Sequence, residues 1–164
     1  MGCIHFQLLP HQVCQLRPHS RGEIRINSAD PMEYPEIFPN YLSDQRDCQV
    51  AIDAIKVARK IAAAPSLKNH VVDEYVPGRQ FQSDDELLEA ARQYSQTIYH
   101  PTSSCKMGQD NLAVVDSHLK VHGLEKLRIA DASIMPEIVS GNTNAPTIMI
   151  GEKAADMILE DNRR

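Results

Sequence analysis

The stretch LRIADASIMPEIVSGNTNAPTIMIGEKAADMI, residues Leu127–Ile158, decides how the rest of the chain is organised. Its first residues, Leu127 to Ala130, predict a short buried strand, because apolar side chains predominate up to the polar Asp131. Residues 133–143 predict a loop, because they include proline, serine, glycine and asparagine, which interrupt regular structure. We expect a helix to follow at once, so the stretch reads as strand, loop and helix.

The predicted helix begins at Asn144, which suits the N-cap, and continues to Asp161. Pro146 is tolerated in its first turn, because the N–H groups there have no helical partner. We expect an apolar stripe to face the core and an acidic stripe to face water. The apolar stripe consists of Ile148, Ala155, Ile158 and Leu159, and the acidic one of Glu152, Asp156 and Glu160.

The first turn of this helix, Asn144 to Thr147, carries no charge and follows a loop that contains glycine. Free N–H groups and the helix dipole give such an end a partial positive charge, so it can hold an anion. An ordinary capped helix of an α/β domain has the same pattern. This stretch alone does not distinguish the two interpretations.

The whole chain has 164 residues, which is the size of one domain with a substantial core. A formal net charge of −5, with no Lys/Arg cluster beyond Arg163–Arg164, argues against a nucleic-acid partner and favours small molecules or proteins. No apolar run is long enough to span a membrane, and Met1 to Pro10 lacks the features of a signal sequence. We therefore expect a protein that is cytoplasmic or peripheral to the inner membrane face.

The cysteines are far apart and form no C-x-x-C pair, which favours reduced thiols over disulfides or a zinc site; they are Cys3, Cys14, Cys48 and Cys105. His118 and His122 are four residues apart, but no carboxylate or third histidine follows at ligand spacing, so no metal site is predicted. The sequence also lacks the G-x-G-x-x-G and P-loop patterns that bind nucleotide phosphates. Any nucleotide must then be held by other residues as well.

The N-terminal half predicts one hairpin and one helix. Residues 13–28 alternate in polarity around a turn at residues 20–22, which indicates a hairpin with one buried face. The proline-rich residues 30–41 predict an irregular, extended connection. Ser43 and Asp44 can then cap a helix that continues through Ala62.

A second helix leads to a corner that holds a histidine. Ser83 and Glu86 form a capping box for a helix that runs to about Thr97. Pro101 keeps His100 out of the helical region, so the imidazole is fixed just after the helix. Taken alone, His100 is also compatible with an ordinary loop histidine. Residues 102–110 are small and polar, as expected of a loop near a ligand, and residues 114–116 and 118–121 predict short strands.

Five stretches, in this order, resemble the C-terminal part of the glucose–methanol–choline (GMC) oxidoreductases, choline dehydrogenases and related alcohol dehydrogenases in particular. They are LRPHSRGEIRINSADP (16–31), FPNYLSD (38–44), YHPTSSCKMG (99–108), VVDSHLKVHG (114–123) and the opening stretch (127–158). The resemblance implies an FAD-dependent enzyme that oxidises alcohols. It further implies an α+β fold, in which an antiparallel sheet is covered by helices and followed by a strand–loop–helix that completes the FAD domain.

By this resemblance, residues 1–112 belong to the substrate-binding domain and residues 113–164 return to the FAD-binding domain. The N-terminal FAD-binding domain is absent from this chain, so we expect a fragment, a truncated reading frame or one piece of a split enzyme. The partners implied are a small-molecule alcohol and the missing FAD-binding portion. The alternative is a non-catalytic fragment or interaction domain that has lost its flavin-binding half.

The resemblance also implies roles for individual residues. His100 matches the active-site histidine, an acid/base that handles the alcohol proton while hydride passes to flavin N5. Asn144 matches the second catalytic position, which assists by donating to the developing alkoxide. Asp131 and Ala132 match the contact with the FAD diphosphate, and the first turn matches the contact with the flavin pyrimidine edge. The residues of that turn are Asn144, Ala145, Pro146 and Thr147.

The chain departs from the family pattern at Ser103, Ser104 and Ser117, where glycine or cysteine, threonine and proline are usual. These serines should leave the loop formable, but they change its polarity. Choline would need an aromatic or acidic cage, and with three Phe, five Tyr and no Trp the sequence does not indicate one. Aliphatic and polyol alcohols are therefore alternatives to choline as the substrate.

Overall fold

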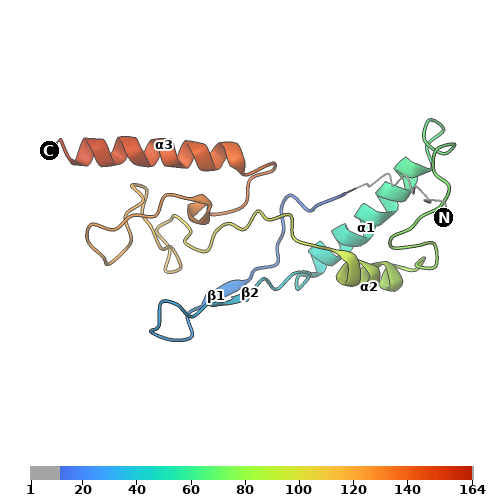
Figure 1. Ribbon diagram of the computed structural model, residues 1–164, viewed down its shortest axis with the longest axis horizontal. Helices are drawn as coiled ribbons and strands as arrows, with labels where there is room; N and C mark the ends of the chain where they lie inside the picture. Colours follow the sequence, from blue (N-terminus) through green and yellow to red (C-terminus); the bar gives the residue numbers. More distant parts are fainter. Residues whose placement is uncertain (1–11, 164) are drawn as a thin grey trace, which may run out of the picture. The chain divides into compact units, whose positions relative to one another are not determined.

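The computed structural model describes residues 12–163, so the predictions for Met1–Pro10 and Cys3 lie outside the described residues. The described chain contains two short strands, two helices, a 3-10 helix and a long C-terminal helix (Figure 1). This mixture confirms the predicted α+β class. In chain order the elements are β1 (Glu23–Arg25), β2 (Glu36–Phe38), α1 (Gln45–Ala62), α2 (Asp84–Tyr94), η1 (Ala132–Ile134) and α3 (Asn144–Asp161).

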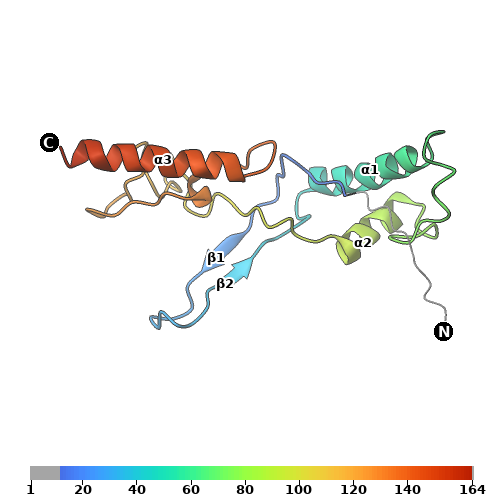
Figure 2. The same ribbon diagram turned by 45° about the horizontal axis from the view of Figure 1, so that its top comes forward.

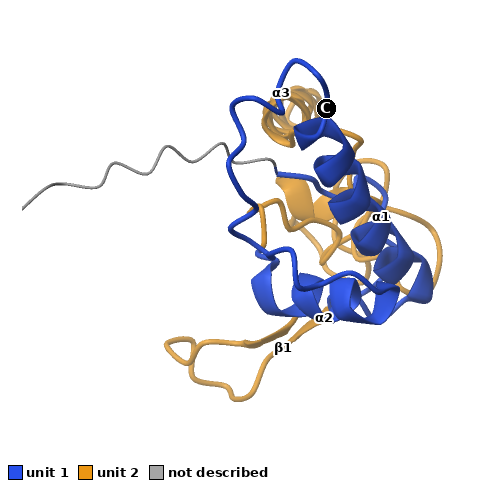
Figure 3. Ribbon diagram, turned by 90° about the vertical axis from the view of Figure 1, so that its right-hand side faces the viewer, with its two compact units in different colours: residues 1–21, 40–96 blue, residues 22–39, 97–164 orange. Residues whose placement is uncertain are grey.

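The described residues form two compact units, coloured separately in Figure 3. Unit 1 contains residues 12–21 and 40–96, and unit 2 contains residues 22–39 and 97–163. The predicted boundary between residues 112 and 113 refers to the domains of a whole enzyme, and it stays a prediction. Every residue predicted to take part in the site lies in unit 2.

Unit 1 is built from helices α1 and α2, which pack against each other. Asp44 accepts a hydrogen bond from the N–H of Arg46, which confirms the predicted cap of α1. Ser83 and Glu86 form the predicted capping box of α2. This helix ends at Tyr94 rather than near Thr97, because Ser95 is already extended at ψ 147°. The packed residues are Ile52 of α1 and Leu87, Ala90 and Ala91 of α2.

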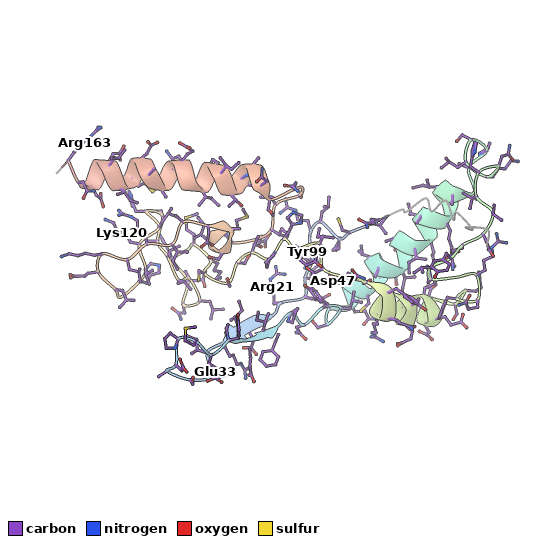
Figure 4. All side chains as sticks on the ribbon, viewed as in Figure 1. Arg21, Glu33, Asp47, Tyr99, Lys120 and Arg163 are labelled. Atoms are coloured by element: carbon purple, nitrogen blue, oxygen red, sulfur yellow. The ribbon has the colours of Figure 1, made fainter. Side chains whose placement is uncertain are left out.

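Asp47, labelled in Figure 4, lies in the first turn of α1 and binds the chain that precedes the helix. Its buried carboxylate accepts the backbone N–H of His19 at 2.9 Å and that of Ser20 at 2.7 Å. The Ser20 hydroxyl oxygen in turn accepts the N–H groups of Ser43 and Asp44, both at 3.2 Å. The predicted hairpin turn at residues 20–22 is therefore wrong: Ser20 binds the start of α1 instead, and the strand begins only at Glu23.

The observed hairpin joins β1 to β2 in unit 2 (Figure 2). The two strands are antiparallel, with Ile24 opposite Ile37. The prediction of a purely irregular connection over residues 30–41 is thus wrong for β2, which lies between Pro35 and Pro39. All six strand residues are exposed in the described structure.

The core of unit 2 gathers side chains from the loops and from α3: Val115, Leu119, Ile134, Met135, Ile150 and Ala154. The strands expected at residues 114–116, 118–121 and 127–130 are present only as isolated bridges. The chain turns too often for longer pairing, because the Asp116 carboxylate accepts the N–H groups of His118 at 2.8 Å and Lys120 at 2.9 Å. Gly123 and Lys126 add two backbone positions with positive φ.

Helix α3 has the predicted extent but a different buried face. It runs alongside the loops that carry η1 (Figures 1 and 2) and contacts η1. Ile150 and Ala154 are buried, and Met157 packs partly against the same cluster. The predicted apolar stripe is wrong, because its members Ile148, Ile158 and Leu159 are 58%, 40% and 55% exposed. Apolar residues occur on several sides of this helix, so periodicity alone did not settle which side is buried.

Candidate active site

His100 lies in a segment whose backbone is constrained on both sides. Tyr99, labelled in Figure 4, has φ +60°, and Ser103 has φ +71°. Both values fall in the left-handed region, which costs an L-residue about 1–2 kcal/mol. Pro101 restricts His100 further. The backbone around the imidazole is thus held in an uncommon conformation, which non-glycine residues adopt mainly where the surroundings enforce it.

The imidazole of His100 is half-buried, and one of its ring nitrogens contacts a side chain. Its Nε2 lies 3.3 Å from the amide nitrogen Nδ2 of Asn142. Its Nδ1 is buried and has no hydrogen-bond partner in the described structure. Within the described residues, Nε2 therefore contacts a polar group and Nδ1 makes no hydrogen bond.

Asn142 has a second contact that links the histidine to helix α3. Its amide oxygen Oδ1 accepts the backbone N–H of Asn144 at 2.9 Å. Asn144 is the first residue of the helix, and the N-cap Thr143 makes no side-chain cap bond. The prediction that Asn144 caps the helix is therefore wrong: Asn142 binds the first helical N–H, and Asn144 supplies that N–H.

Sequence reasoning missed Asn142 as a site residue. The signal was present in the pattern Asn142-Thr143-Asn144, because an asparagine side chain bonds the backbone two residues further on. Two asparagines in this pattern both suit a helix start, and the sequence does not show which one is already helical. The structure brings the side chain of Asn142, rather than that of Asn144, to His100.

The first turn of α3 keeps the properties that predict an anion site. It contains no acidic residue, and Pro146 has no N–H. The N–H of Ala145 has no partner among the described residues. The hydroxyl of Thr147 donates to the carbonyl of Thr143 at 2.6 Å, so it bonds the backbone of the N-cap residue. The helix therefore directs one free N–H and its positive dipole end outward.

Asp131 and Ala132 are placed by two sets of hydrogen bonds. The Asp131 carboxylate caps η1 by accepting the N–H of Ser133 at 2.7 Å. The backbone of η1 is joined to the loop that follows His100, because Cys105 donates to the Ser133 carbonyl at 3.0 Å. Met107 donates likewise to the Ile134 carbonyl at 2.8 Å. The predicted diphosphate-binding residues and the loop that follows His100 (the histidine loop) are thus joined by backbone hydrogen bonds.

The other histidines of unit 2, His118 and His122, make hydrogen bonds within the surrounding loops. A ring nitrogen of His122 lies 3.1 Å from the carbonyl oxygen of Gly108. His118 is exposed, and its backbone N–H binds Asp116. Burial alone would raise the pKa of the Asp116 carboxyl, but hydrogen bonds from Lys120 and His118 outweigh burial and lower it. Within residues 12–163, no three His, Cys, Asp or Glu side chains gather as metal ligands would.

Comparisons with known proteins establish the class of this chain. A model of the GMC oxidoreductase family matches residues 18–151. The chain therefore belongs to the GMC oxidoreductase family.

Individual relatives are similar over most of the chain. It is 52% identical to an alcohol dehydrogenase [acceptor] of Pseudomonas putida, over 90% of this chain and 27% of that protein. It is 50% identical to an oxygen-dependent choline dehydrogenase of Escherichia coli O45:K1, over 89% of this chain and 26% of that one. An FAD-dependent oxidoreductase from Chaetomium thermophilum has a similar structure, with a TM-score of 0.84, 32% identity and coverage of 90% of this chain and 26% of that one.

The chain thus spans about a quarter of the length of the relatives it matches. Within residues 12–163, no helix combines the length and apolar character needed to cross a membrane.

Proposed function

We propose that this chain forms the C-terminal part of an FAD-dependent enzyme that oxidises the CH–OH group of a small alcohol. The contact between His100 and Asn142 at the start of α3 is the observation that carries the proposal. In this contact an imidazole nitrogen lies 3.3 Å from an amide nitrogen, beside the end of a helix that favours negative charge. The relatives named alcohol dehydrogenase and choline dehydrogenase support an alcohol as the substrate.

In this proposal His100 acts as the acid/base. A neutral imidazole removes the hydroxyl proton of the alcohol with a ring nitrogen that carries a lone pair. Nε2 is the ring nitrogen that faces another polar group, so it is the atom that we assign to this step. A positioned acid/base group of this kind typically contributes about 10²–10⁴-fold to the rate.

Asn142 stabilises the oxygen that loses the proton. Its Nδ2 carries two N–H groups, and one of them can donate to the alkoxide while His100 Nε2 holds the proton. The alcohol oxygen would then replace the direct contact between the two side chains. Removing one donor of this type costs about 10²–10³ in rate in other enzymes.

The residues present fit the polar edge of an FAD. The first turn of α3 has no acidic side chain, and the N–H of Ala145 points away from helical partners. Asp131 and Ala132 stand at the start of η1, which contacts α3. We propose that Ala145, Pro146 and Thr147, with Asn144, hold the pyrimidine edge and that Asp131 and Ala132 contact the diphosphate. FAD, when bound, supplies the acceptor for the hydride that leaves the alcohol carbon.

A chimeric enzyme tests this proposal. The matching quarter of the Pseudomonas putida alcohol dehydrogenase is replaced by this chain, and the product is purified and assayed for flavin and alcohol oxidation. We expect stoichiometric FAD and turnover in the chimera, and no flavin on the isolated 164-residue chain after gel filtration. His100→Ala should slow the loss of oxidised-flavin absorbance by about 10²–10⁴-fold in single-turnover stopped flow.

His118→Ala is the matched control, because His118 is exposed in the same unit. It should leave the rate unchanged. A chimera that folds and binds FAD but does not oxidise alcohols would favour the non-catalytic alternative. An unaltered rate in the His100→Ala chimera would remove His100 from the mechanism.

A further inference from the structure

The amide of Asn142 has a defined orientation, because its two ends have different partners. The oxygen and nitrogen of an asparagine amide are distinguished by the hydrogen bonds they make. The backbone N–H of Asn144 is only a donor, and it lies 2.9 Å from Oδ1 of Asn142. The oxygen must therefore face Asn144, and the NH₂ group must face Nε2 of His100 at 3.3 Å.

This orientation has a consequence for the proton on the imidazole. An NH₂ group is only a donor, so it interacts favourably with Nε2 only when that nitrogen is unprotonated. In a neutral imidazole the single proton is then on Nδ1. In the opposite tautomer, an N–H at Nε2 would face the N–H groups of Asn142.

The surroundings of Nδ1 do not oppose this assignment. Nδ1 is buried without a hydrogen-bond partner in the described structure, so it is unsatisfied both with and without a proton. The difference between the two tautomers is therefore set at Nε2, where Asn142 is the neighbour.

We infer that Asn142, in addition to its proposed contact with the alcohol oxygen, holds neutral His100 in the Nδ1–H tautomer. The orienting contact is the backbone N–H of Asn144, so the first residue of α3 sets the tautomer of a histidine through one intervening side chain. The tautomer itself does not depend on the proposed reaction. Its catalytic meaning rests on the proposed function: it leaves a lone pair on Nε2, the ring nitrogen assigned to remove the alcohol proton.

Nuclear magnetic resonance of the full chain tests the inference without any assay of activity. The protein is labelled with ¹⁵N-histidine, and two-bond ¹H–¹⁵N correlations report which ring nitrogen carries the proton. The His100 signals are assigned from their loss in the His100→Gln variant. At a pH where the imidazole is neutral, we expect His100 to be in the Nδ1–H form, whereas exposed histidines in water favour the Nε2–H form.

Asn142→Asp is the decisive variant. An aspartate keeps an oxygen for the N–H of Asn144, so the start of α3 is retained. Its other oxygen is an acceptor, which should convert neutral His100 to the Nε2–H form. Asn144→Ala removes a side chain but keeps the backbone N–H that orients Asn142, so it should leave the tautomer unchanged.

A His100 found in the Nε2–H form in the unmodified chain would overturn the inference, as would an unchanged tautomer in Asn142→Asp. Either result is distinguishable from failure of the proposed function. The tautomer can be as expected in a chain whose chimera does not oxidise alcohols, and an active chimera can contain the other tautomer.

Discussion

Nδ2 of Asn142 lies 3.3 Å from Nε2 of His100, although 42 residues separate the two in sequence. The same side chain binds the first N–H of α3 through its oxygen. One asparagine therefore connects the histidine loop to the end of the helix that favours an anion. Both connections use an uncharged side chain, so the helix end keeps its positive potential.

The capping role of Asn142 can be separated from that of its neighbour by stability measurements. Asn142→Ala leaves the first N–H of α3 without its partner, and we expect the free energy of unfolding to fall by about 1 kcal/mol. Asn142→Asp should cost much less, because aspartate is an equally good cap. Urea denaturation followed by circular dichroism measures both.

Asn144→Ala tests which asparagine caps α3: Asn142, as in the structure, or Asn144, as the sequence predicts. Asn144 is already helical, and alanine has the higher helix propensity, so the substitution should be neutral or slightly stabilising. A loss of about 1 kcal/mol at Asn144 with none at Asn142 would restore the sequence-based assignment of the cap.

Replacing Ser103 by glycine should not lower the stability of the protein, as a serine-to-glycine change normally does. Its φ of +71° is unfavourable for any residue with a Cβ, and glycine removes that strain. Glycine also adds entropy to the unfolded chain, which offsets part of the gain. We expect Ser103→Gly to range from neutral to about 1 kcal/mol more stable. The adjacent Ser104→Gly, in a turn and at a position without positive φ, should instead lower stability by about 0.4–1 kcal/mol in the same urea titration, because glycine makes the unfolded chain more flexible.

Asp47 should be important for the stability of unit 1. Its buried carboxylate accepts the N–H groups of His19 and Ser20, and both would lose a charged acceptor in Asp47→Ala. Hydrogen bonds to charged groups contribute about 1.5–3 kcal/mol, so we expect a loss of about 2–3 kcal/mol. Asp53→Ala, which removes an exposed carboxylate from the same helix, is the matched control and should change stability little. Equal losses in the two variants would show that the contacts of Asp47 are unimportant.

Sequence reasoning succeeded where a structure is decided by neighbouring residues. The capping box of Ser83 and Glu86 and the N-cap Asp44 are local patterns, and both were predicted. The extent of α3 was predicted for the same reason. Family resemblance, in turn, directed attention to His100 and to the helix start.

Sequence reasoning failed where contacts between distant residues determine the structure. The binding of Ser20 to the start of α1 joins residues more than 20 positions apart, and no local pattern shows it. The buried side of α3 depends on which apolar residues meet Ile134 and Val115. The choice of Asn142 over Asn144 depends on where His100 lies, 42 residues earlier.

Helix α3 ends at an acidic residue, Asp161. Asp161 accepts hydrogen bonds from Lys120 and from Arg128, both at 2.6 Å. These two bonds lower the pKa of the Asp161 carboxyl from 3.8 to about 2. A carboxylate at a helix C-terminus is normally unfavourable, and here two cations from the preceding loops offset that effect. The ion pairs of Asp161 with Lys120 and Arg128 connect the C-terminal end of α3 to the preceding loops. Lys120 is labelled in Figure 4.

The sign of the pH dependence follows from the direction of this shift. The folded-state pKa is lower than the unfolded one, so the stabilisation is complete above the unfolded value of 3.8 and is lost as the pH falls toward about 2. We compare the urea midpoints of the unmodified chain and of Asp161→Asn between these limits and at neutral pH. The unmodified chain should have the higher midpoint at neutral pH, and the difference should vanish near pH 2. High salt should also reduce this difference in urea midpoint, because the Asp161 carboxylate is exposed.

Glu160→Gln is the control. It removes an adjacent carboxylate that makes no ion pair among the described residues, so its urea midpoint should differ little from that of the unmodified chain at every pH. A constant difference for Asp161→Asn across this range would show that the ion pairs add nothing to stability.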